Sequence, residues 1–266
     1  MILHQVGLKQ GKVILAGAGP GDPDLITIKA ANALSTADVV LTDRLVSPEI
    51  LKTHVPSNAL IIKVGKQGHK GKSTPQKTIN ELMVEHASQG KTVVRLKGGD
   101  ISVFSNILDE LQTLVEHDIP YELIPGVSAA MGAAAYTGIP LTARNYALGV
   151  RLLTFYKHDA VPADYWYDLA NTDDTLVFYM SSETLDELVD RLRAHNITSD
   201  KYIAVVEQAT TKNQNAYISA IHNHKQTFAG LKFQSPSLVI IGKVVALHEQ
   251  FSWLKNSGKQ EAYFTS

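Results

Sequence analysis

The sequence contains no cysteine. A disulfide framework, a thiolate metal site and a cysteine nucleophile are therefore excluded. The sequence also lacks an excess of charge of one sign, since its formal net charge is −1. A chain with so little net charge has no strong electrostatic attraction for nucleic acid or an anionic membrane. No apolar run reaches the ~18 residues that a transmembrane helix requires. We therefore expect a protein that binds neither nucleic acid nor a membrane.

Several catalytic and targeting patterns are missing as well. The 10 histidines show no H-E-x-x-H or comparable spacing, and His222 and His224 are expected at the start of a surface helix, so we expect no metal site. There is no G-x-S-x-G nucleophile elbow. The amino-terminal residues, Met1 to Val6, lack the basic region and long apolar core of a signal peptide, so a cytoplasmic location is expected.

The first half of the chain alternates short apolar segments with amphipathic ones. Strands are predicted at residues 13–16, 39–41, 60–62, 93–96 and 121–124. Helices are predicted at residues 25–34, 48–53, 76–88, 107–116 and 128–136. This alternation indicates parallel strands joined by right-handed crossovers, and therefore an N-terminal α/β domain with a doubly wound sheet over residues 11–145.

The second half has a different pattern. Strands are predicted at residues 152–155, 176–180, 203–206, 215–219 and 238–241, and helices at residues 185–194 and 221–228. Because residues 206–219 have the pattern of a hairpin, this sheet should be mixed. We expect a smaller C-terminal α/β domain over residues 146–254, followed by a polar, frayed tail at residues 255–266.

A glycine-rich loop, Gly17-Ala-Gly-Pro-Gly-Asp-Pro23, joins the first predicted strand to the first predicted helix. Such a loop brings backbone amides close to a nucleotide-like ligand. Asp22 stands where the dinucleotide fingerprint requires its third glycine, and Pro20 removes an amide donor. Asp22 and Pro23 are typical of a helix cap and first helical residue, and an acidic cap disfavours a pyrophosphate. The loop therefore suits a ligand with little negative charge.

Ligands of parallel α/β sheets bind beyond the carboxyl ends of the strands. The sequence places five groups of residues at those ends, where they should share one cleft: Gly17 to Pro23, Asp43, Lys66, Gly98 to Asp100 and Pro125 to Ala129. Asp43 can be a ribose ligand, a general base or a helix cap. Asp100 can accept hydrogen bonds from a ligand, or Lys97-Gly-Gly-Asp100 can be an ordinary turn.

The basic segment Gly65-Lys-Gln-Gly-His-Lys-Gly-Lys-Ser73 nearly matches a phosphate-binding P-loop. A P-loop has four residues between its first glycine and Gly-Lys-Ser, whereas five residues separate Gly65 from Gly71. The helix that follows also starts late. Two interpretations remain, a basic loop over an anionic substrate and a solvated surface loop.

Ordered motifs run through the chain from Val13 to Trp253. They are Ala16-Gly-Ala-Gly-Pro-Gly-Asp-Pro23, Asp43-Arg-Leu-Val-Ser47, Val64-Gly-Lys66, Val93-Val-Arg-Leu-Lys-Gly-Gly-Asp100, Ile124-Pro-Gly-Val-Ser-Ala129, Gly138-Ile-Pro-Leu-Thr142, Leu176-Val-Phe-Tyr-Met180, Val205-Val-Glu-Gln-Ala-Thr210 and Ser235-Pro-Ser-Leu-Val-Ile-Ile-Gly242. Together they resemble one family, the S-adenosylmethionine-dependent uroporphyrinogen-III C-methyltransferases, within the wider tetrapyrrole methylase class.

The resemblance implies the two-domain tetrapyrrole methylase fold, a homodimer, and S-adenosylmethionine held between the domains and converted to S-adenosylhomocysteine. The family's cofactor contacts fall here on Pro20, Gly98, Gly99, Asp100, Val103, Ser128, Ala129, Met180 and Ala209. Because this cofactor carries a sulfonium and no phosphate, it is compatible with a proline-bearing, acid-capped loop.

The implied reaction is the methylation of uroporphyrinogen III to precorrin-2 by way of precorrin-1, in sirohaem or cobalamin biosynthesis. The family's proton acceptor falls on Asp43 and its proton donor on Lys66. The tetrapyrrole substrate carries several carboxylates. The basic side chains expected to anchor them are Lys66, His69, Lys70, Lys72, Arg144 and Lys157.

The sequence departs from the family pattern on the side that faces the substrate. Asn106 replaces a family arginine, and residues 101–110 have the pattern of a continuous helix in place of a glycine-rich turn. Thr142-Ala-Arg144 and Thr154-Phe-Tyr156 also differ from the usual motifs. Three interpretations follow: the same substrate is anchored differently, a related tetrapyrrole is methylated, or the protein binds the cofactor with little activity. We favour the first.

Overall fold

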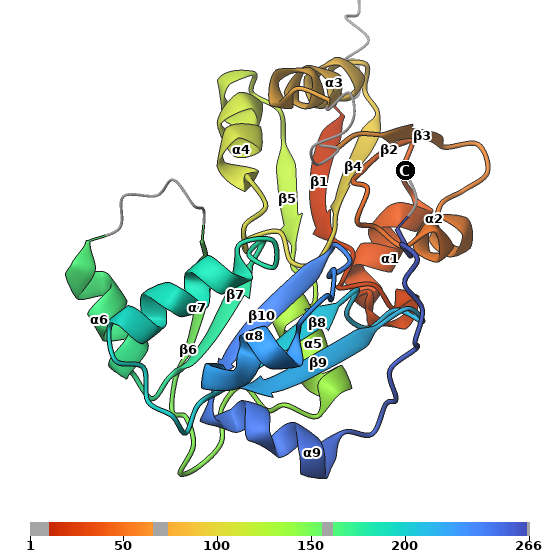
Figure 1. Cartoon of the computed structure of the whole chain (residues 1–266). Coiled ribbons are helices and arrows are strands. Elements are labelled where there is room, and N and C mark those ends of the chain that lie inside the picture. The colour runs from red at the N-terminus through yellow and green to blue at the C-terminus, as the bar shows by residue number, and fades with distance from the viewer. Residues whose placement is uncertain (1–10, 66–73, 156–161, 265–266) are drawn as a thin grey trace, which may run out of the picture. The chain divides into compact units, whose positions relative to one another are not determined.

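The computed structural model describes residues 11–65, 74–155 and 162–264 (Figure 1). The chain forms two compact units, which divide at Ser128 and Ala129. The described part of unit 1 consists of residues 11–65 and 74–128 together with Phe264, and that of unit 2 consists of residues 129–155 and 162–263. The structural division thus lies earlier than the domain boundary expected after residue 145, because the helix that begins at Ala129 packs against the second sheet.

Unit 1 contains a five-stranded sheet in which every pairing is parallel. Its strands, in the order β3-β2-β4-β1-β5, are β3 (Leu60–Lys63), β2 (Val39–Thr42), β4 (Thr92–Lys97), β1 (Lys12–Gly17) and β5 (Tyr121–Ile124). The central strands are apolar on both faces, as expected for a sheet covered on both sides. The predicted doubly wound parallel sheet is confirmed.

Helices cover both faces of this sheet (Figure 1). On one face lie α1 (Ile28–Ser35) and α2 (Pro48–His54), and on the other α3 (Gln76–Ser88) and α4 (Ile107–Glu116). Alternate residues of β1 enter the two cores, since Ile14 packs toward α1 and Leu15 toward α3. Because all the strands are parallel, each crossover leaves the sheet at its carboxyl edge and returns at its amino edge, so the loops that follow the strands share the carboxyl edge.

The predicted first helix, residues 25–34, is wrong at its start. The Asp22 carboxylate caps a short 3₁₀ helix, Pro23–Leu25, by accepting a hydrogen bond from the Asp24 amide at 2.9 Å. The α-helix α1 begins only at Ile28, where the Thr27 hydroxyl caps the amide of Ala30 at 3.2 Å. Asp22 and Pro23 have the capping roles that the sequence predicted, but a second cap inside the segment divides the helix in two.

Unit 2 contains a mixed five-stranded sheet, as predicted. Its strands, in the order β6-β7-β10-β8-β9, are β6 (Val150–Thr154), β7 (Thr175–Tyr179), β10 (Ser237–Gly242), β8 (Tyr202–Glu207) and β9 (Asn215–Ala220). Strands β6 and β7 are parallel, and the remaining pairs are antiparallel. The predicted hairpin is β8–β9.

Helices pack on both faces of the second sheet. One face carries α6 (Ala163–Asn171) and α7 (Leu185–Ala194), and the other carries α5 (Ala129–Thr137) and the 3₁₀ helix Lys243–Leu247. The predicted helix over residues 221–228 is a 3₁₀ turn, Ile221–Asn223, followed by α8 (His224–Thr227). His224 begins a helix whose other residues are exposed, as expected of a surface helix, but its own side chain is fully buried. The short helix α9 (His248–Phe251) completes this unit.

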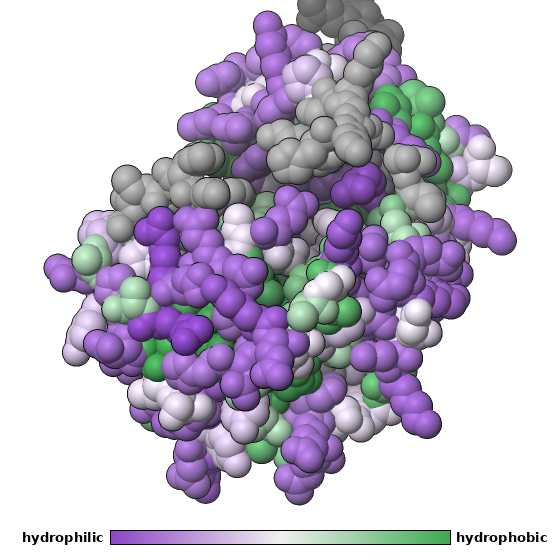
Figure 2. Space-filling model, in the orientation of Figure 1, coloured by the Kyte–Doolittle hydropathy of each residue, from purple (hydrophilic) through white to green (hydrophobic). Residues whose placement is uncertain are grey.

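The segment expected to fray is held in place. Residues 255–263 lie along β9 and the loop before it, with the Asn256 side chain bonded to both backbone groups of Ala216 at 2.7 and 2.9 Å. Hydrophilic residues predominate on the face shown in Figure 2. In the described parts of the chain, no helix is long and apolar enough to cross a membrane.

Candidate functional site

Three backbone loops meet at the carboxyl edge of the sheet in unit 1. Gly19 and Gly99 exchange two backbone hydrogen bonds, of 3.2 and 2.7 Å. A methyl group on Gly126 would lie 2.3 Å from the carbonyl oxygen of Gly99, and one on Gly17 would lie 2.6 Å from the Gly126 nitrogen. Only glycine permits this approach. The loops after β1, β4 and β5 therefore converge as the sequence predicted.

Asp100 fastens these loops together. Its carboxylate accepts a hydrogen bond from the Ser102 amide at 2.8 Å, another from the Ser102 hydroxyl, and one from the Gly126 amide at 3.0 Å. Burial raises the pKa of the Asp100 carboxyl, but these bonds outweigh that effect and hold the pKa below its ordinary value. Asp100 thus has a structural role in these loops, and its cofactor contact stays a prediction.

Asp100→Asn should lower the stability of the protein in a pH-dependent way. Because the folded-state pKa of Asp100 lies below its unfolded value of about 3.9, the ionised carboxylate stabilises the fold above that pH. Its contribution is lost as the pH falls through the folded-state pKa. We expect urea unfolding to give a lower free energy of unfolding for the variant than for the parent at pH 7, and a smaller difference at more acid pH. A deficit independent of pH would contradict this account.

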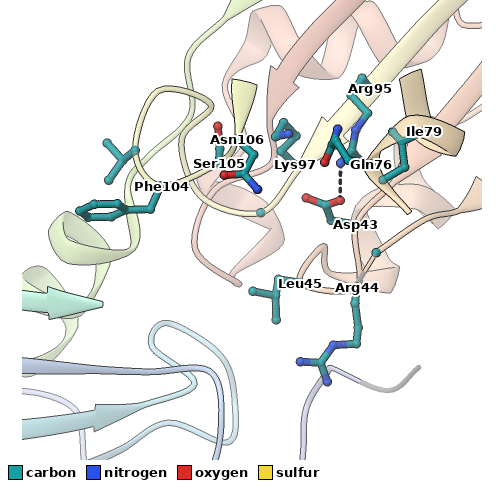
Figure 3. Close-up of a pocket in the computed structure, with 13 residues that line it drawn as sticks. Asp43, Arg44, Leu45, Gln76, Ile79, Arg95, Lys97, Phe104, Ser105 and Asn106 are labelled. Atoms are coloured by element: carbon teal, nitrogen blue, oxygen red, sulfur yellow. Dashed lines mark hydrogen bonds and ion pairs between the residues drawn. The ribbon is translucent and has the colours of Figure 1, made fainter. Parts of the chain in front are cut away.

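A cavity of about 240 Å³ opens next to the three loops, entirely within unit 1. Polar and charged side chains line the cavity together with the apolar side chains of Leu45, Ile79 and Phe104, which lie apart from one another (Figure 3). The lining residues are Asp43, Arg44, Leu45, Gly65, Gln76, Ile79, Arg95, Lys97, Gly98, Val103, Phe104, Ser105 and Asn106. Pockets for drug-sized ligands usually measure about 300–1,000 Å³, so this cavity would hold only a part of a larger molecule.

Four charged side chains form a network at the base of the cavity. The Glu110 carboxylate, 0% exposed, accepts hydrogen bonds from Lys97 Nζ at 2.8 and 2.9 Å and from Arg95 Nε at 3.0 Å. Arg95 Nη2 donates to Asp43 Oδ1 at 2.6 Å, and Arg95 Nη1 donates to the carbonyl oxygens of Leu41 and Leu96. Two cations and two carboxylates therefore balance, and every nitrogen of the guanidinium is engaged.

The network keeps Arg95 charged and holds the Asp43 carboxylate in a fixed orientation. Burial lowers the pKa of Arg95, but the carboxylates of Asp43 and Glu110 outweigh this and raise it above its ordinary value. Burial and the positive charge of Arg95 lower the pKa of Lys97, which Glu110 opposes only in part. Asp43 is the partly exposed member, at 27% of its side chain. A carboxylate held rigidly at a cavity wall can accept a proton from a bound molecule.

The segment 101–106 is a turn and not part of a continuous helix. Phe104 and Asn106 have left-handed backbones, with φ of 50° and 54°, and α4 begins after them at Ile107. The predicted helix over residues 101–110 is therefore wrong in its first half. Asparagine tolerates this conformation better than most residues, which explains how a turn forms here without glycine. The turn places Phe104, Ser105 and Asn106 at the cavity (Figure 3).

In unit 2, three of the predicted cofactor contacts gather at one edge of the sheet. Met180 follows β7 and Ala209 follows β8, and both strands flank the start of β10. The amide of Ala130, next to Ala129 at the start of α5, donates to the Tyr179 hydroxyl at 3.2 Å. Met180 has a φ of 55° and is half-exposed. The topology thus brings residues from distant parts of the sequence to one edge.

The folds and motifs correspond to known proteins. A family model described as Tetrapyrrole (Corrin/Porphyrin) Methylases matches residues 12–223. The chain belongs to the tetrapyrrole methylase family. This tetrapyrrole methylase resembles the Siroheme synthase of Pseudomonas aeruginosa (strain LESB58), with 42% identity over 247 residues, 93% of this chain and 53% of the relative. The Siroheme synthase of Vesicomyosocius okutanii is 40% identical over 250 residues, 94% of this chain and 53% of that protein. The chain spans about half the length of these curated relatives.

Solved structures agree with this assignment. A uroporphyrin-III C-methyltransferase from Thermus thermophilus is 33% identical, with a TM-score of 0.75 over 94% of this chain and 100% of that one. The Thermus enzyme complexed with S-adenyl homocysteine is 32% identical, with a TM-score of 0.74 over 89% and 100% of the two chains. A cobalt precorrin-4 methyltransferase is 25% identical, with a TM-score of 0.78 over 88% and 95%. The tetrapyrrole methylase is therefore an S-adenosylmethionine-dependent methyltransferase.

The predicted site residues of this tetrapyrrole methylase fall into groups according to where they lie in the structure. Asp43, Gly98 and Val103 line the cavity of unit 1. Gly99, Asp100, Ser128 and the buried Pro20 belong to the neighbouring loops, and Ala129, Met180 and Ala209 lie in unit 2. Lys66 lies outside the described residues, as do His69, Lys70, Lys72 and Lys157. Arg144 is exposed and does not line the cavity.

Sequence reasoning missed the cations that line the cavity, Arg44, Arg95 and Lys97, and their buried partner Glu110. A signal was present, because Arg95 and Lys97 alternate with apolar residues in a central parallel strand. A charge buried there must be paired. The position of its partner on α4 could not be read from the strand alone.

Proposed function

We propose that this tetrapyrrole methylase transfers two methyl groups from S-adenosylmethionine to uroporphyrinogen III, giving precorrin-2 by way of precorrin-1. The observation that carries the proposal is the Asp43 carboxylate, fixed by Arg95 at 2.6 Å on the wall of a cavity lined by cations. The names of the relatives support the same substrate, since sirohaem synthases are 42% identical and a uroporphyrin-III C-methyltransferase is 33% identical.

The reaction requires the protein to align the reacting carbon, methyl group and sulfur and to supply one proton acceptor. An electron-rich pyrrole carbon attacks the methyl group, the carbon–sulfur bond breaks, and S-adenosylhomocysteine leaves. A proton must then leave the macrocycle, and Asp43 accepts it as general base. Lys66 remains the proposed proton donor, on the resemblance alone. We retain the nine cofactor contacts given above as part of this proposal.

The cavity supports an altered way of anchoring the same substrate. Asn106 replaces a family cation, but Arg44 lines the same cavity, and in the described parts of the chain it has no ion-pair partner. Figure 3 shows its guanidinium turned away from Asp43. Arg95 and Lys97 are already engaged with carboxylates. Arg44 is thus the cation that we assign to a substrate carboxylate.

Incubation of the purified protein with S-adenosylmethionine and uroporphyrinogen III under reducing conditions tests the proposal. We expect mass spectrometry of the tetrapyrrole to show the gain of one and then of two methyl groups. Methylation of a related tetrapyrrole in place of uroporphyrinogen III would contradict the substrate assignment. Binding of S-adenosylhomocysteine without any methylated product would indicate a binding-only homologue.

A further inference from the structure

The loop that carries Ala209 has an unfavourable backbone. Gln208 and Thr210, on either side of Ala209, have φ of 47° and 67°, a left-handed conformation that side chains other than glycine rarely adopt. Such a conformation persists only where the surroundings impose it. The Gln208 amide donates to the Pro236 carbonyl oxygen at 2.7 Å, and the Thr210 amide donates to Gln214 Oε1 at 2.7 Å.

The Gln208 side chain is bonded to the polypeptide backbone of residues 255–263, which we call the tail segment. Its Nε2 donates to the Glu261 carbonyl oxygen at 3.1 Å, and its Oε1 accepts from the Tyr263 amide at 2.5 Å. Gln208 is 0% exposed. Both ends of this buried amide are therefore satisfied by the tail segment, and losing one partner would leave a polar group buried without a bond.

Further buried amides repeat the arrangement along the same loop. Asn213 Nδ2 also donates to the Glu261 carbonyl oxygen, at 3.2 Å, and Asn215 Nδ2 donates to the Lys259 carbonyl oxygen at 2.9 Å. Asn215 Oδ1 accepts from the Gly258 amide at 3.0 Å. These side chains are at most 2% exposed. The tail segment is thus built into the loop and is not a loose extension.

We propose that the tail segment is a structural part of the S-adenosylmethionine site, and that Gln208 is the positioning residue through which it holds Ala209. The inference rests on the proposed cofactor contact of Ala209. Ala209 lies at the sheet edge that also carries Met180, and the left-handed residues around it aim the loop at that edge. With Gln208 released from the tail segment, the loop relaxes toward an ordinary backbone and Ala209 moves.

Gln208→Met tests the inference, because methionine fills a similar volume without the amide. Calorimetry with S-adenosylhomocysteine should show a dissociation constant about tenfold higher than that of the parent. An effect of this size is expected from the loss of roughly one buried hydrogen-bonded pair. In turnover assays the KM for S-adenosylmethionine should rise while kcat recovers at saturating cofactor. Amide hydrogen exchange should increase at residues 208–214. The matched control is Gln226→Met, the same change at an exposed position of α8 outside the tail segment, which should bind like the parent.

A second pair of variants decides the question if Gln208→Met does not fold. Tyr263→Pro removes the amide that donates to Gln208, whereas Tyr263→Ala keeps this amide and removes only the ring. We expect the proline variant alone to bind S-adenosylhomocysteine more weakly. Parental affinity in both Gln208→Met and Tyr263→Pro would overturn the inference. Because binding is measured without the tetrapyrrole, failure of the inference and failure of the proposed substrate give different results.

Discussion

Asp43→Asn should lower kcat for methyl transfer by about 10²–10⁴-fold and leave the affinity for S-adenosylhomocysteine unchanged. Asparagine keeps an oxygen that can accept the hydrogen bond from Arg95 Nη2, which now spans 2.6 Å, so the geometry of the cavity wall should be preserved. What the variant loses is the ability to take a proton from the methylated macrocycle. Steady-state kinetics combined with calorimetry would separate the two effects.

Asp109→Asn is the matched control for this experiment. Asp109 is an exposed residue of the same unit, on α4, and does not line the cavity. It should retain the parental kcat. If Asp43→Asn turned over at the parental rate, the carboxylate would not be the base, and the proton would have to leave to another group or to water.

Glu110→Gln should destabilise the protein by about 3–5 kcal/mol, because two buried cations, Arg95 and Lys97, are then left with the single carboxylate of Asp43, and Lys97 loses the carboxylate that it contacts. Glu110 is 0% exposed and both cations are 3% exposed, so water cannot replace the lost carboxylate. Chemical denaturation at neutral pH would measure the effect. The orientation of Asp43 depends on Arg95, so kcat should also fall in the folded fraction.

The difference in the free energy of unfolding between the parent and Glu110→Gln should become smaller as the pH rises. Burial already lowers the pKa of Lys97, and without Glu110 its neutral form is favoured further in the folded state, while the unfolded chain keeps its proton up to a pH of about 10. The unfolded state then binds more protons, and stability increases with pH. Glu116→Gln, the same change at an exposed position of α4, should have little effect at any pH. A deficit equal for both variants would contradict a buried charge network.

Much of the fold could be predicted because its signals are local. The strand β5 and the helices α3, α4 and α7 were predicted with the bounds that the structure shows, since apolar periodicity and flanking turns define them. The division of the first helix was missed, because Asp22 and Thr27 both act as caps within a few residues. The turn at residues 101–106 was missed because it uses left-handed residues other than glycine.

The features of the candidate site can likewise be divided into those that the sequence determined and those that only the tertiary structure decided. The sequence by itself determined the glycine loops, the position of Asp43 at a strand end and the family resemblance, because these depend on residue type and on order along the chain. Tertiary structure alone decided that Glu110 on α4 sits between Arg95 and Lys97 of β4, and that Arg95 reaches Asp43 after β2. It alone decided that the tail segment holds Gln208. Buried charges and amides must find partners, and those partners come from whichever element the packing places beside them.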